Sequence, residues 1–269
     1  MRGARRARAL RGPDVEAFLH GLGWRGGALS AATDARIQPL IERYYPPATH
    51  PYQRLAGEVR RHLRPDATVL EIGCGRGAPM LSTMKGQAGR LIGIDVVEFT
   101  AADPDLELWR CDVTAMTQIA DGSIDLAFSR SVMEHIEDVD RAYAEIGRVL
   151  APGGTYVFLT PNFWDYASLI SAMVPNALHG RIVRATEGRE EEDVFPTHYR
   201  SNTARSIRRL AAAAGLSVQG LQHLGQYPTY FRFSPTLFRL GCLYGKLLER
   251  FQPLHGLQGW IFCELRKAP

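Results

Sequence analysis

A glycine-rich turn behind an apolar run constrains the fold of this chain more than any other feature. Residues 69–77 read VLEIGCGRG, which predicts a buried strand followed by a tight turn. A second apolar run ends at Asp95, 22 residues after Gly73. Glycines let the backbone approach a ligand closely, and a carboxylate at this distance can accept hydrogen bonds from ribose hydroxyls. The spacing therefore predicts an α/β fold that binds a nucleoside-containing cofactor.

The residues around the turn separate three classes of cofactor. A phosphate-binding loop would need Gly-Lys followed by Ser or Thr, and this turn lacks that sequence. A dinucleotide fold prefers the spacing G-x-G-x-x-G, in which a helix N-terminus faces a pyrophosphate. Here the spacing is G-x-G-x-G, and Glu71 beside it would repel a pyrophosphate and attract a cation. The turn favours a cationic cofactor, and a nicotinamide oxidoreductase is kept as an alternative.

The turn resembles motif I of the class I S-adenosylmethionine-dependent methyltransferases, whose cofactor carries an amino group and a sulfonium but no phosphate. Further segments resemble the same family, in its order, between about residues 55 and 162. The resemblance implies a Rossmann-like seven-stranded α/β sheet, mostly parallel with an antiparallel last strand, with helices on both faces and a helical cap. The segments are an acidic loop at 111–113, a fourth strand at 123–129, a stretch with Glu-His at 131–136, and a Pro-Gly-Gly turn with a fifth strand at 150–158.

The resemblance also implies which residues hold S-adenosylmethionine. In the family, the glycine turn and the acid after the second strand contact the cofactor, and the aspartate of the acidic loop accepts from the adenine amino group. The candidate cofactor-binding residues are Glu71, Gly73, Cys74, Gly75, Gly77, Asp95, Val96, Asp112, Val113, Ser129, Arg130 and Glu134.

Three residues are candidates for the chemistry at the methyl acceptor. His135 follows the fourth strand, and His198 precedes a predicted helix at the edge where ligands bind in open α/β sheets. A histidine there can take a proton from the acceptor or donate a hydrogen bond to it. Tyr199 could anchor a phenolic or acidic substrate. Relatives that bind a metal beside the Glu-His pair carry an earlier glutamate, and this chain has Ser131 there, so we predict no metal site.

Proline, glycine and charge patterns divide the chain into segments. Strands and helices are expected to alternate between residues 68 and 162, as in a parallel sheet. The segment after the fifth strand is aromatic and charged, and its place at the ligand edge predicts a substrate lid. The segments are a basic arm at 1–13 that we expect to be disordered, a helical cap at 14–66, the cofactor-binding core at 67–162, the lid insertion at 163–202, and the rest of the core at 203–269 with a helical insertion at 227–258.

Composition excludes several other classes of protein. The formal charge is +4, and five arginines within residues 2–11 account for the excess, so we expect no nucleic-acid partner. Four cysteines show no C-x-x-C spacing, which favours a reducing, cytoplasmic setting without a disulfide framework. The chain has no apolar run of about 18 residues, so no transmembrane helix is predicted.

The predicted function is transfer of a methyl group from S-adenosylmethionine to a small-molecule or lipid-like acceptor by direct displacement. Aromatic residues in both insertions favour an apolar acceptor, although such residues also pack a cap onto a sheet. The amphipathic stretch 237–251 is compatible with peripheral contact with a membrane. An RNA or protein methyltransferase and a cofactor-binding partner without catalysis are the alternatives. The sequence assigns no oligomeric state and does not distinguish oxygen, carbon and nitrogen acceptors.

Overall fold

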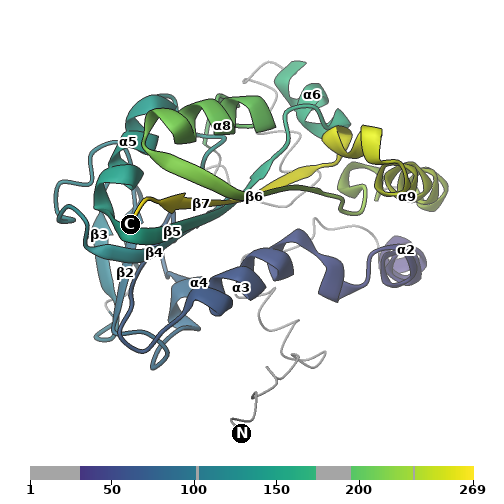
Figure 1. Ribbon diagram of the computed structural model, residues 1–269. Helices are drawn as coiled ribbons and strands as arrows, with labels where there is room; N and C mark the ends of the chain where they lie inside the picture. The colour runs from purple at the N-terminus through teal and green to yellow at the C-terminus, as the bar shows by residue number, and fades with distance from the viewer. Residues whose placement is uncertain (1–30, 101–102, 174–194, 233) are drawn as a thin grey trace, which may run out of the picture.

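A computed structural model describes residues 31–100, 103–173, 195–232 and 234–269 of the chain (Figure 1). The basic arm at 1–13, the first part of the predicted helical cap and the central part of the predicted lid lie outside these residues. The described residues contain one seven-stranded sheet with helices on both faces. In Figure 1, α5 and α8 lie above the sheet, and α3 and α4 lie below it.

The sheet has the strand order β3-β2-β1-β4-β5-β7-β6. The pairs from β3 through β5 are parallel, and β7 is antiparallel to both of its neighbours, β5 and β6. This topology confirms the mostly parallel seven-stranded sheet with an antiparallel last strand. The strands are β1 (Thr68–Ile72), β2 (Arg90–Asp95), β3 (Glu107–Arg110), β4 (Ile124–Arg130), β5 (Leu150–Pro161), β6 (Leu216–Leu224) and β7 (Trp260–Lys267).

Two apolar cores sandwich the sheet because its central strands are buried on both sides. Successive side chains of a strand point to opposite faces, so Val69 joins one core and Leu70 the other. Helices α3 (Pro51–His62) and α4 (Pro79–Ser82) cover the first face, which we call the α3 face. Helices α5 (Val139–Val149) and α8 (Ala204–Ala213) cover the second, the α5 face.

The helices of the α5 face begin at well-formed caps and pack closely. Asp138 accepts a hydrogen bond from the backbone N–H of Arg141 at the start of α5, and Thr203 forms a capping box at the start of α8. The buried Tyr143 hydroxyl lies 2.8 Å from the Ser201 hydroxyl oxygen. This contact fixes the segment before α8 against α5, and that segment carries two of the candidate catalytic residues.

The connections between strands contain less helix than the sequence pattern predicts. Among the described residues, no helix lies between β2 and β3 or between β3 and β4, and α4 has four residues. The expectation of regular alternation is therefore wrong in this half of the sheet. Asp95 accepts from the backbone N–H of Val97, and Asp112 accepts from that of Thr114. Such aspartate turns offer the backbone an alternative to helical hydrogen bonds.

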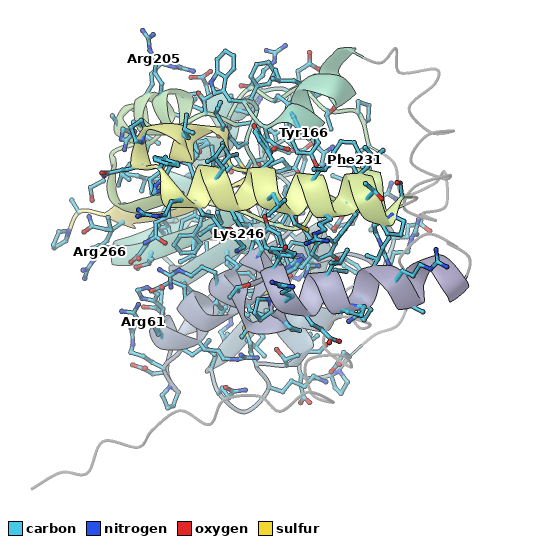
Figure 2. The ribbon with its side chains drawn as sticks, turned by 90° about the vertical axis from the view of Figure 1, so that its right-hand side faces the viewer. Arg61, Tyr166, Arg205, Phe231, Lys246 and Arg266 are labelled. Carbon is cyan, nitrogen blue, oxygen red and sulfur yellow. The ribbon has the colours of Figure 1, made fainter. Side chains whose placement is uncertain are left out.

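Two helices pack together at the end of the sheet where β1, β4 and β5 finish. They are α2 (Ala31–Tyr44) and α9 (Pro235–Arg250), which Figure 1 shows end-on and Figure 2 shows from the side. Pro39 lies inside α2 without splitting it. A short α6 (Tyr166–Met173) follows β5, η1 (Pro47–Thr49) follows α2, and η3 (Thr229–Phe231) and η4 (Gln252–Leu257) flank α9. The buried residues that join α2 and α9 are Ile37, Ile41, Tyr45, Tyr227, Phe238 and Cys242.

The outer side of α9 is apolar and exposed. Arg239 and Arg250 lie exposed on the same helix, so the helix has the amphipathic character that the sequence predicts. Peripheral contact with a membrane stays a prediction. None of the helices in the described part of the chain has the length and apolarity needed to cross a bilayer. The exposed apolar residues of this side, together with the residue after the helix, are Leu237, Leu240, Leu243, Tyr244, Leu247 and Phe251.

Candidate functional site

Three charged residues stand at the carboxyl ends of neighbouring strands. Glu71 lies next to the last position of β1, Asp95 ends β2 and Arg130 ends β4. Because side chains alternate along a strand, all three belong to the α3 face. Ligands of open α/β sheets bind outside this edge, so the topology brings the predicted cofactor residues to the expected place.

The glycine turn links β1 to β2 through its backbone. The N–H of Gly73 donates to the carbonyl oxygen of Ile94 at 2.8 Å, and the N–H of Gly75 donates to the Asp95 carboxylate at 2.7 Å. Gly73 has φ +72°, a left-handed conformation that side chains disfavour. A Cβ atom at Gly73 would lie 2.3 Å from Cγ2 of Val132. The turn therefore requires glycine at Gly73 for conformation and for space.

Asp95 is placed to serve both the turn and a ligand. One carboxylate oxygen accepts from the N–H of Gly75, and the other accepts from the N–H of Val97 at 3.2 Å. A carboxylate has about four acceptor positions, so about two stay available for the hydroxyls of a ribose. The partial exposure of Asp95 is consistent with this role.

Glu71 is a buried carboxyl group beside the turn. Its side chain accepts a hydrogen bond from the backbone N–H of Leu81 at 3.0 Å, and only 5% of the residue is exposed. Burial raises the pKa of Glu71 to about 8, although the positive charge of Arg130 opposes this shift. The group is therefore mainly protonated near neutral pH until a cation comes close to it.

This raised pKa makes binding of a cationic cofactor pH-dependent. A cation favours the ionised carboxylate, so binding below the pKa must release the proton of Glu71. We expect the affinity for S-adenosylmethionine to rise about tenfold per pH unit between pH 6 and 7 and to level off near pH 8. Calorimetric titrations across this range would measure the slope, and the Glu71→Gln variant should lack it. An equal slope in both proteins would contradict the assignment.

The remaining cofactor candidates differ in what their side chains can offer. Asp112 is exposed and holds the N–H and hydroxyl of Thr114, each at 2.8 Å. The hydroxyl of Ser129 lies 2.6 Å from that of Tyr156 on the α5 face, away from Glu71. The role of Ser129 as a cofactor ligand stays a prediction. Gly77 and Val96 are exposed, whereas Cys74 and Val113 are buried.

Glu134 joins β5 to the segment before α8. Its buried carboxylate accepts from the hydroxyl of Thr160 at 3.0 Å, and that hydroxyl accepts from the amide of Asn202 at 2.7 Å. The backbone carbonyl of Glu134 accepts from the N–H groups of His198 and Tyr199. Glu134 thus fixes the position of the candidate catalytic segment, and its role as a cofactor ligand stays a prediction.

The candidate catalytic residues lie on two adjacent segments, the one after β4 and the one before α8. The ring of His135 makes a hydrogen bond that fixes its orientation. Nδ1 of His135 donates to the carbonyl oxygen of Pro196 at 2.9 Å, which leaves Nε2 of a neutral ring able to accept a proton. His198 is exposed. The Tyr199 ring packs edge-on against Phe163, with 5.9 Å between centroids. This arrangement favours His135 as the base.

Two of the three described non-glycine residues with positive φ lie in the same place, and the third, Ala78, follows the glycine turn. Ser131 has φ +54° and Tyr199 has φ +52°, conformations uncommon for residues other than glycine. Ser131 lies three residues before Glu134, and the N–H of Tyr199 donates to the backbone carbonyl of Glu134. Such strain persists only where surrounding bonds over-determine it, and it is concentrated at functional sites.

The sequence analysis missed an aromatic group at this edge. His50 caps α3, and its Nδ1 accepts from the N–H of Tyr52 at 3.2 Å. The guanidinium carbon of Arg130 lies 4.6 Å from the Tyr52 ring centroid, and the Trp260 ring lies 5.6 Å from it. Burial, together with the smaller effect of the positive charge of Arg130, lowers the pKa of His50 to about 4. A His-Pro pair before a predicted helix was the available signal for His50.

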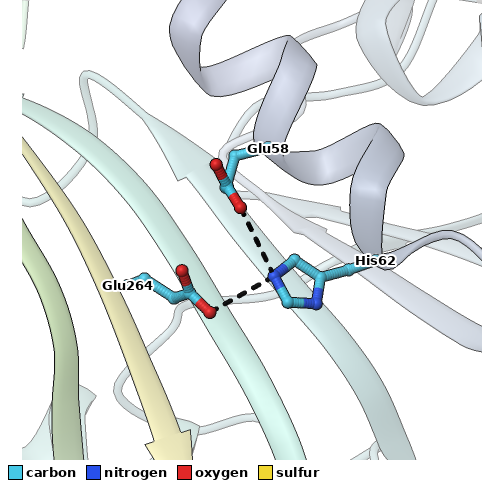
Figure 3. Close-up of side chains that lie close together, drawn as sticks. All are labelled: Glu58, His62 and Glu264. Carbon is cyan, nitrogen blue, oxygen red and sulfur yellow. Dashed lines mark ion pairs between the residues drawn. The ribbon is translucent and has the colours of Figure 1, made fainter. Parts of the chain in front are cut away.

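One group of possible metal ligands lies elsewhere. Among the described residues, Glu58, His62 and Glu264 bring their ligand atoms together (Figure 3). Arg54 and Arg61 both pair with Glu58, at 2.6 and 2.9 Å, so its charge is already balanced. Glu264 lies four residues along β7 from the ligand edge, about 13 Å away. We interpret this group as an ion-pair network that holds α3 on the sheet.

Comparison with known proteins gives a family match over most of the chain. The methyltransferase domain family matches residues 41–221. A probable S-adenosylmethionine-dependent methyltransferase of Mycolicibacterium smegmatis is 34% identical over 143 residues, which are 50% of this chain and 52% of that protein. A 24-methylenesterol C-methyltransferase 2 of Arabidopsis thaliana is 28% identical over 120 residues, 41% of this chain and 33% of that protein. The chain spans about half or less of the length of these relatives.

Solved structures share the fold at low sequence identity. Geranyl diphosphate C-methyltransferase from Streptomyces coelicolor A3(2), in complex with Mg²⁺, geranyl-S-thiolodiphosphate and S-adenosyl-L-homocysteine, has a TM-score of 0.52 and 17% identity, covering 80% of this chain and 76% of that chain. The [4+2]-cyclase SpnF has a TM-score of 0.51 and 16% identity, covering 91% and 99%. These likenesses show the fold. Because one of these proteins is named a methyltransferase and the other a cyclase, the fold alone does not define a reaction, which must be argued from the site.

Proposed function

The chain belongs to the class I S-adenosylmethionine-dependent methyltransferases, and we propose that it transfers a methyl group to a small-molecule or lipid-like acceptor. S-adenosylmethionine is the cofactor of this family, as the glycine turn predicts. When bound, this cofactor supplies a methyl group activated on a positively charged sulfur. The observation that carries the proposal is the pair of carboxylates, Glu71 and Asp95, on either side of a glycine turn at one sheet edge.

The residues present fit this cofactor. Asp95 has acceptor positions left for ribose hydroxyls, and the buried Glu71 offers a negative charge for an ammonium or sulfonium group. Gly75 has no atom within 4 Å of the position that a Cβ would take, which leaves room for a ligand to come close to the backbone. The pyrophosphate of a nicotinamide dinucleotide beside Glu71 would disfavour the ionised carboxylate, so this group would add no charge attraction for that cofactor.

Aromatic contacts at the same edge support an apolar acceptor. Tyr227 packs against Tyr45 at 6.5 Å and against His50 at 6.2 Å between centroids. Tyr166 and Phe231 stack at 5.7 Å, and Figure 2 shows them beside α9. Tyr45 and Tyr227 belong to the buried core that joins α2 and α9, beside the sheet edge where an acceptor would approach. The names of the sterol and geranyl diphosphate methyltransferases also point to lipid-like acceptors for related proteins.

The protein's part in the reaction is to position the acceptor, exclude water and accept a proton. Displacement at an activated methyl group mainly needs an aligned lone pair on the acceptor. Where that atom carries a proton, Nε2 of His135 can accept it, because Nδ1 is engaged with the carbonyl of Pro196. The Glu134–Thr160 bond positions the segment that bears this histidine.

Calorimetric titration tests the cofactor half of the proposal. We expect S-adenosylmethionine and S-adenosylhomocysteine to bind at micromolar concentrations and NAD not to bind, with little effect of magnesium. The bound protein can then be incubated with fractionated lipid and small-molecule extracts and cofactor carrying an isotope-labelled methyl group. Label in an extracted small molecule supports the proposal. Cofactor binding with label only in RNA or protein, or with no transfer to any fraction, would favour one of the alternative functions.

The two histidines are expected to behave differently. His135→Ala should lower turnover by about 10² to 10⁴-fold if the acceptor atom carries a proton, because a positioned base contributes that much. His198→Ala is the matched control, since its exposed side chain lies in the adjacent segment, and we expect a much smaller loss. Neither change should alter cofactor affinity in calorimetry. Equal turnover in the His135 variant and the wild type would remove His135 from the mechanism.

A further inference from the structure

Two hydrogen-bond donors at the ligand edge are buried without a partner. Among the described residues, Nη1 of Arg130 and Nε1 of Trp260 have no hydrogen-bond partner and almost no contact with solvent. An unpaired buried donor destabilises the folded state, and such donors are rare in native proteins. Both side chains contact the same ring, that of Tyr52. Two unpaired donors on side chains that contact one ring point to a ligand group that accepts from both.

His50 adds a third donor to the same group. Its ring centroid lies 4.7 Å from that of Tyr52, and its Nδ1 accepts from a backbone N–H. A neutral histidine whose Nδ1 accepts must carry its proton on Nε2. Arg130, Trp260 and His50 all contact the Tyr52 ring, and their side chains offer N–H donors to a ligand. The positive charge of Arg130 makes an anion the best match for these donors.

Charge is divided along this edge of the sheet. Glu71 and Asp95 stand on β1 and β2, whereas Arg130 stands on β4 and Trp260 on β7. All four lie on the α3 face, because each is an even number of residues from a neighbour on its own strand that packs into the core of that face. The acidic half fits the cationic groups of the cofactor. The donor half extends two strands beyond β4, about 10 Å further, where the cofactor's partner in the reaction would lie.

We propose that Arg130, Trp260 and His50 form a subsite for an anionic group, a carboxylate or a phosphate, on an otherwise apolar methyl acceptor. This inference rests on the proposed function and narrows its substrate class. The aromatic rings of Tyr45 and Tyr227 continue from His50 into the buried core between α2 and α9, so the surroundings of this subsite are apolar. Tyr52 must shift when the anion enters, since it lies against both Arg130 and Trp260.

Calorimetry with simple amphiphilic anions tests the subsite. Wild-type protein saturated with S-adenosylhomocysteine is titrated with decyl phosphate and with decanoate, and with decanol as the neutral control. Trp260→Phe removes the indole N–H and keeps an aromatic ring, and Arg130→Met removes the guanidinium. Arg54→Met is the matched control, because Arg54 also lies over an aromatic ring, that of Phe262, but pairs with Glu58.

We expect at least one anion to bind more tightly than decanol. Both Trp260→Phe and Arg130→Met should weaken binding of that anion tenfold or more. Arg54→Met should leave the affinity for the anion unchanged. Equal binding of anion and alcohol by the wild type, or unchanged anion binding by Trp260→Phe, would overturn the proposal. Thermal melts identify a variant that fails to fold, and Trp260→Phe alone then decides the outcome.

Two further titrations separate this proposal from its premise. The methionyl carboxylate of the cofactor is a competing source of the anion, and 5′-methylthioadenosine lacks it. If the variants lose affinity for S-adenosylhomocysteine but not for 5′-methylthioadenosine, the donors hold the cofactor carboxylate and the acceptor assignment is wrong. If wild-type protein binds no S-adenosylhomocysteine, the proposed function itself fails. Normal cofactor binding without anion binding contradicts the subsite only.

Discussion

Asp95→Ala is expected to weaken binding of S-adenosylmethionine by about 1.5 to 3 kcal/mol, roughly 10- to 150-fold. The variant removes the acceptors for the ribose hydroxyls. It also frees the N–H of Gly75, which donates to Asp95 at 2.7 Å and so shapes the turn. Calorimetric titration with the cofactor and with S-adenosylhomocysteine measures the loss. Affinity equal to that of the wild type would defeat the ribose assignment.

A matched control separates ligand binding from loss of a structural hydrogen bond. Asp125 also accepts from a backbone N–H, that of Thr68 at 2.9 Å, and it lies at the opposite end of β4 from Arg130. Asp125→Ala should lower the free energy of unfolding by an amount similar to Asp95→Ala and leave cofactor affinity unchanged. Loss of affinity in both variants would mean that the effect is transmitted through general destabilisation.

Features that depend on local sequence could be predicted well. The apolar strand, the glycine turn and the acid at the end of the next strand are each defined within a few residues. Parallel strands then bring Glu71 and Asp95 to one edge without further information. The caps of α5 and α8 follow equally local rules, because Asp138 and Thr203 accept from N–H groups within the first turn.

Features that depend on distant pairs could not be predicted. Tyr52 and Trp260 come from opposite ends of the chain, and their contact arises because β7 lies between β5 and β6 with its first residue at the ligand edge. No local pattern marks Trp260 as part of a site. The engagement of Ser129 with Tyr156 has the same origin, since it requires the register of β4 and β5. Adjacent residues of a strand share a motif but face opposite sides of the sheet, so the direction of the Ser129 side chain follows from the fold, and its role as a cofactor ligand stays a prediction.

Electrostatic roles also needed the folded structure. The sequence places Glu71 beside a cation site, but its raised pKa follows from burial on the α3 face, which only packing reveals. Likewise, His50 is one of several histidines in the sequence, and its role as a donor follows from the cap that it forms at α3. The residue types alone predict that Glu71 can carry a negative charge and that His50 can donate or accept a proton. Which protonation state each group has depends on its tertiary contacts.

Gly73→Ala is expected to lower the free energy of unfolding by about 2 to 5 kcal/mol. A left-handed alanine costs about 1 to 2 kcal/mol, and overpacking costs about 1 to 3 kcal/mol more. The second cost arises because the new methyl group would lie 2.3 Å from Cγ2 of Val132. Gly75→Ala provides the comparison, since Gly75 has φ +71° but no atom within 4 Å of the position that its new methyl group would take. It should incur the conformational cost alone.

The two costs can be separated by a double-mutant cycle. Val132→Ala removes the methyl group that Gly73→Ala would strike, so the double variant should recover the packing cost and retain the conformational one. Urea unfolding of the two single variants and the double variant gives the coupling energy, which we expect to be about 1 to 3 kcal/mol in favour of the double variant. A coupling near zero would show that the turn moves away from Val132. In that case Gly73→Ala should still weaken S-adenosylhomocysteine binding, because moving the turn displaces the Gly75 N–H from Asp95.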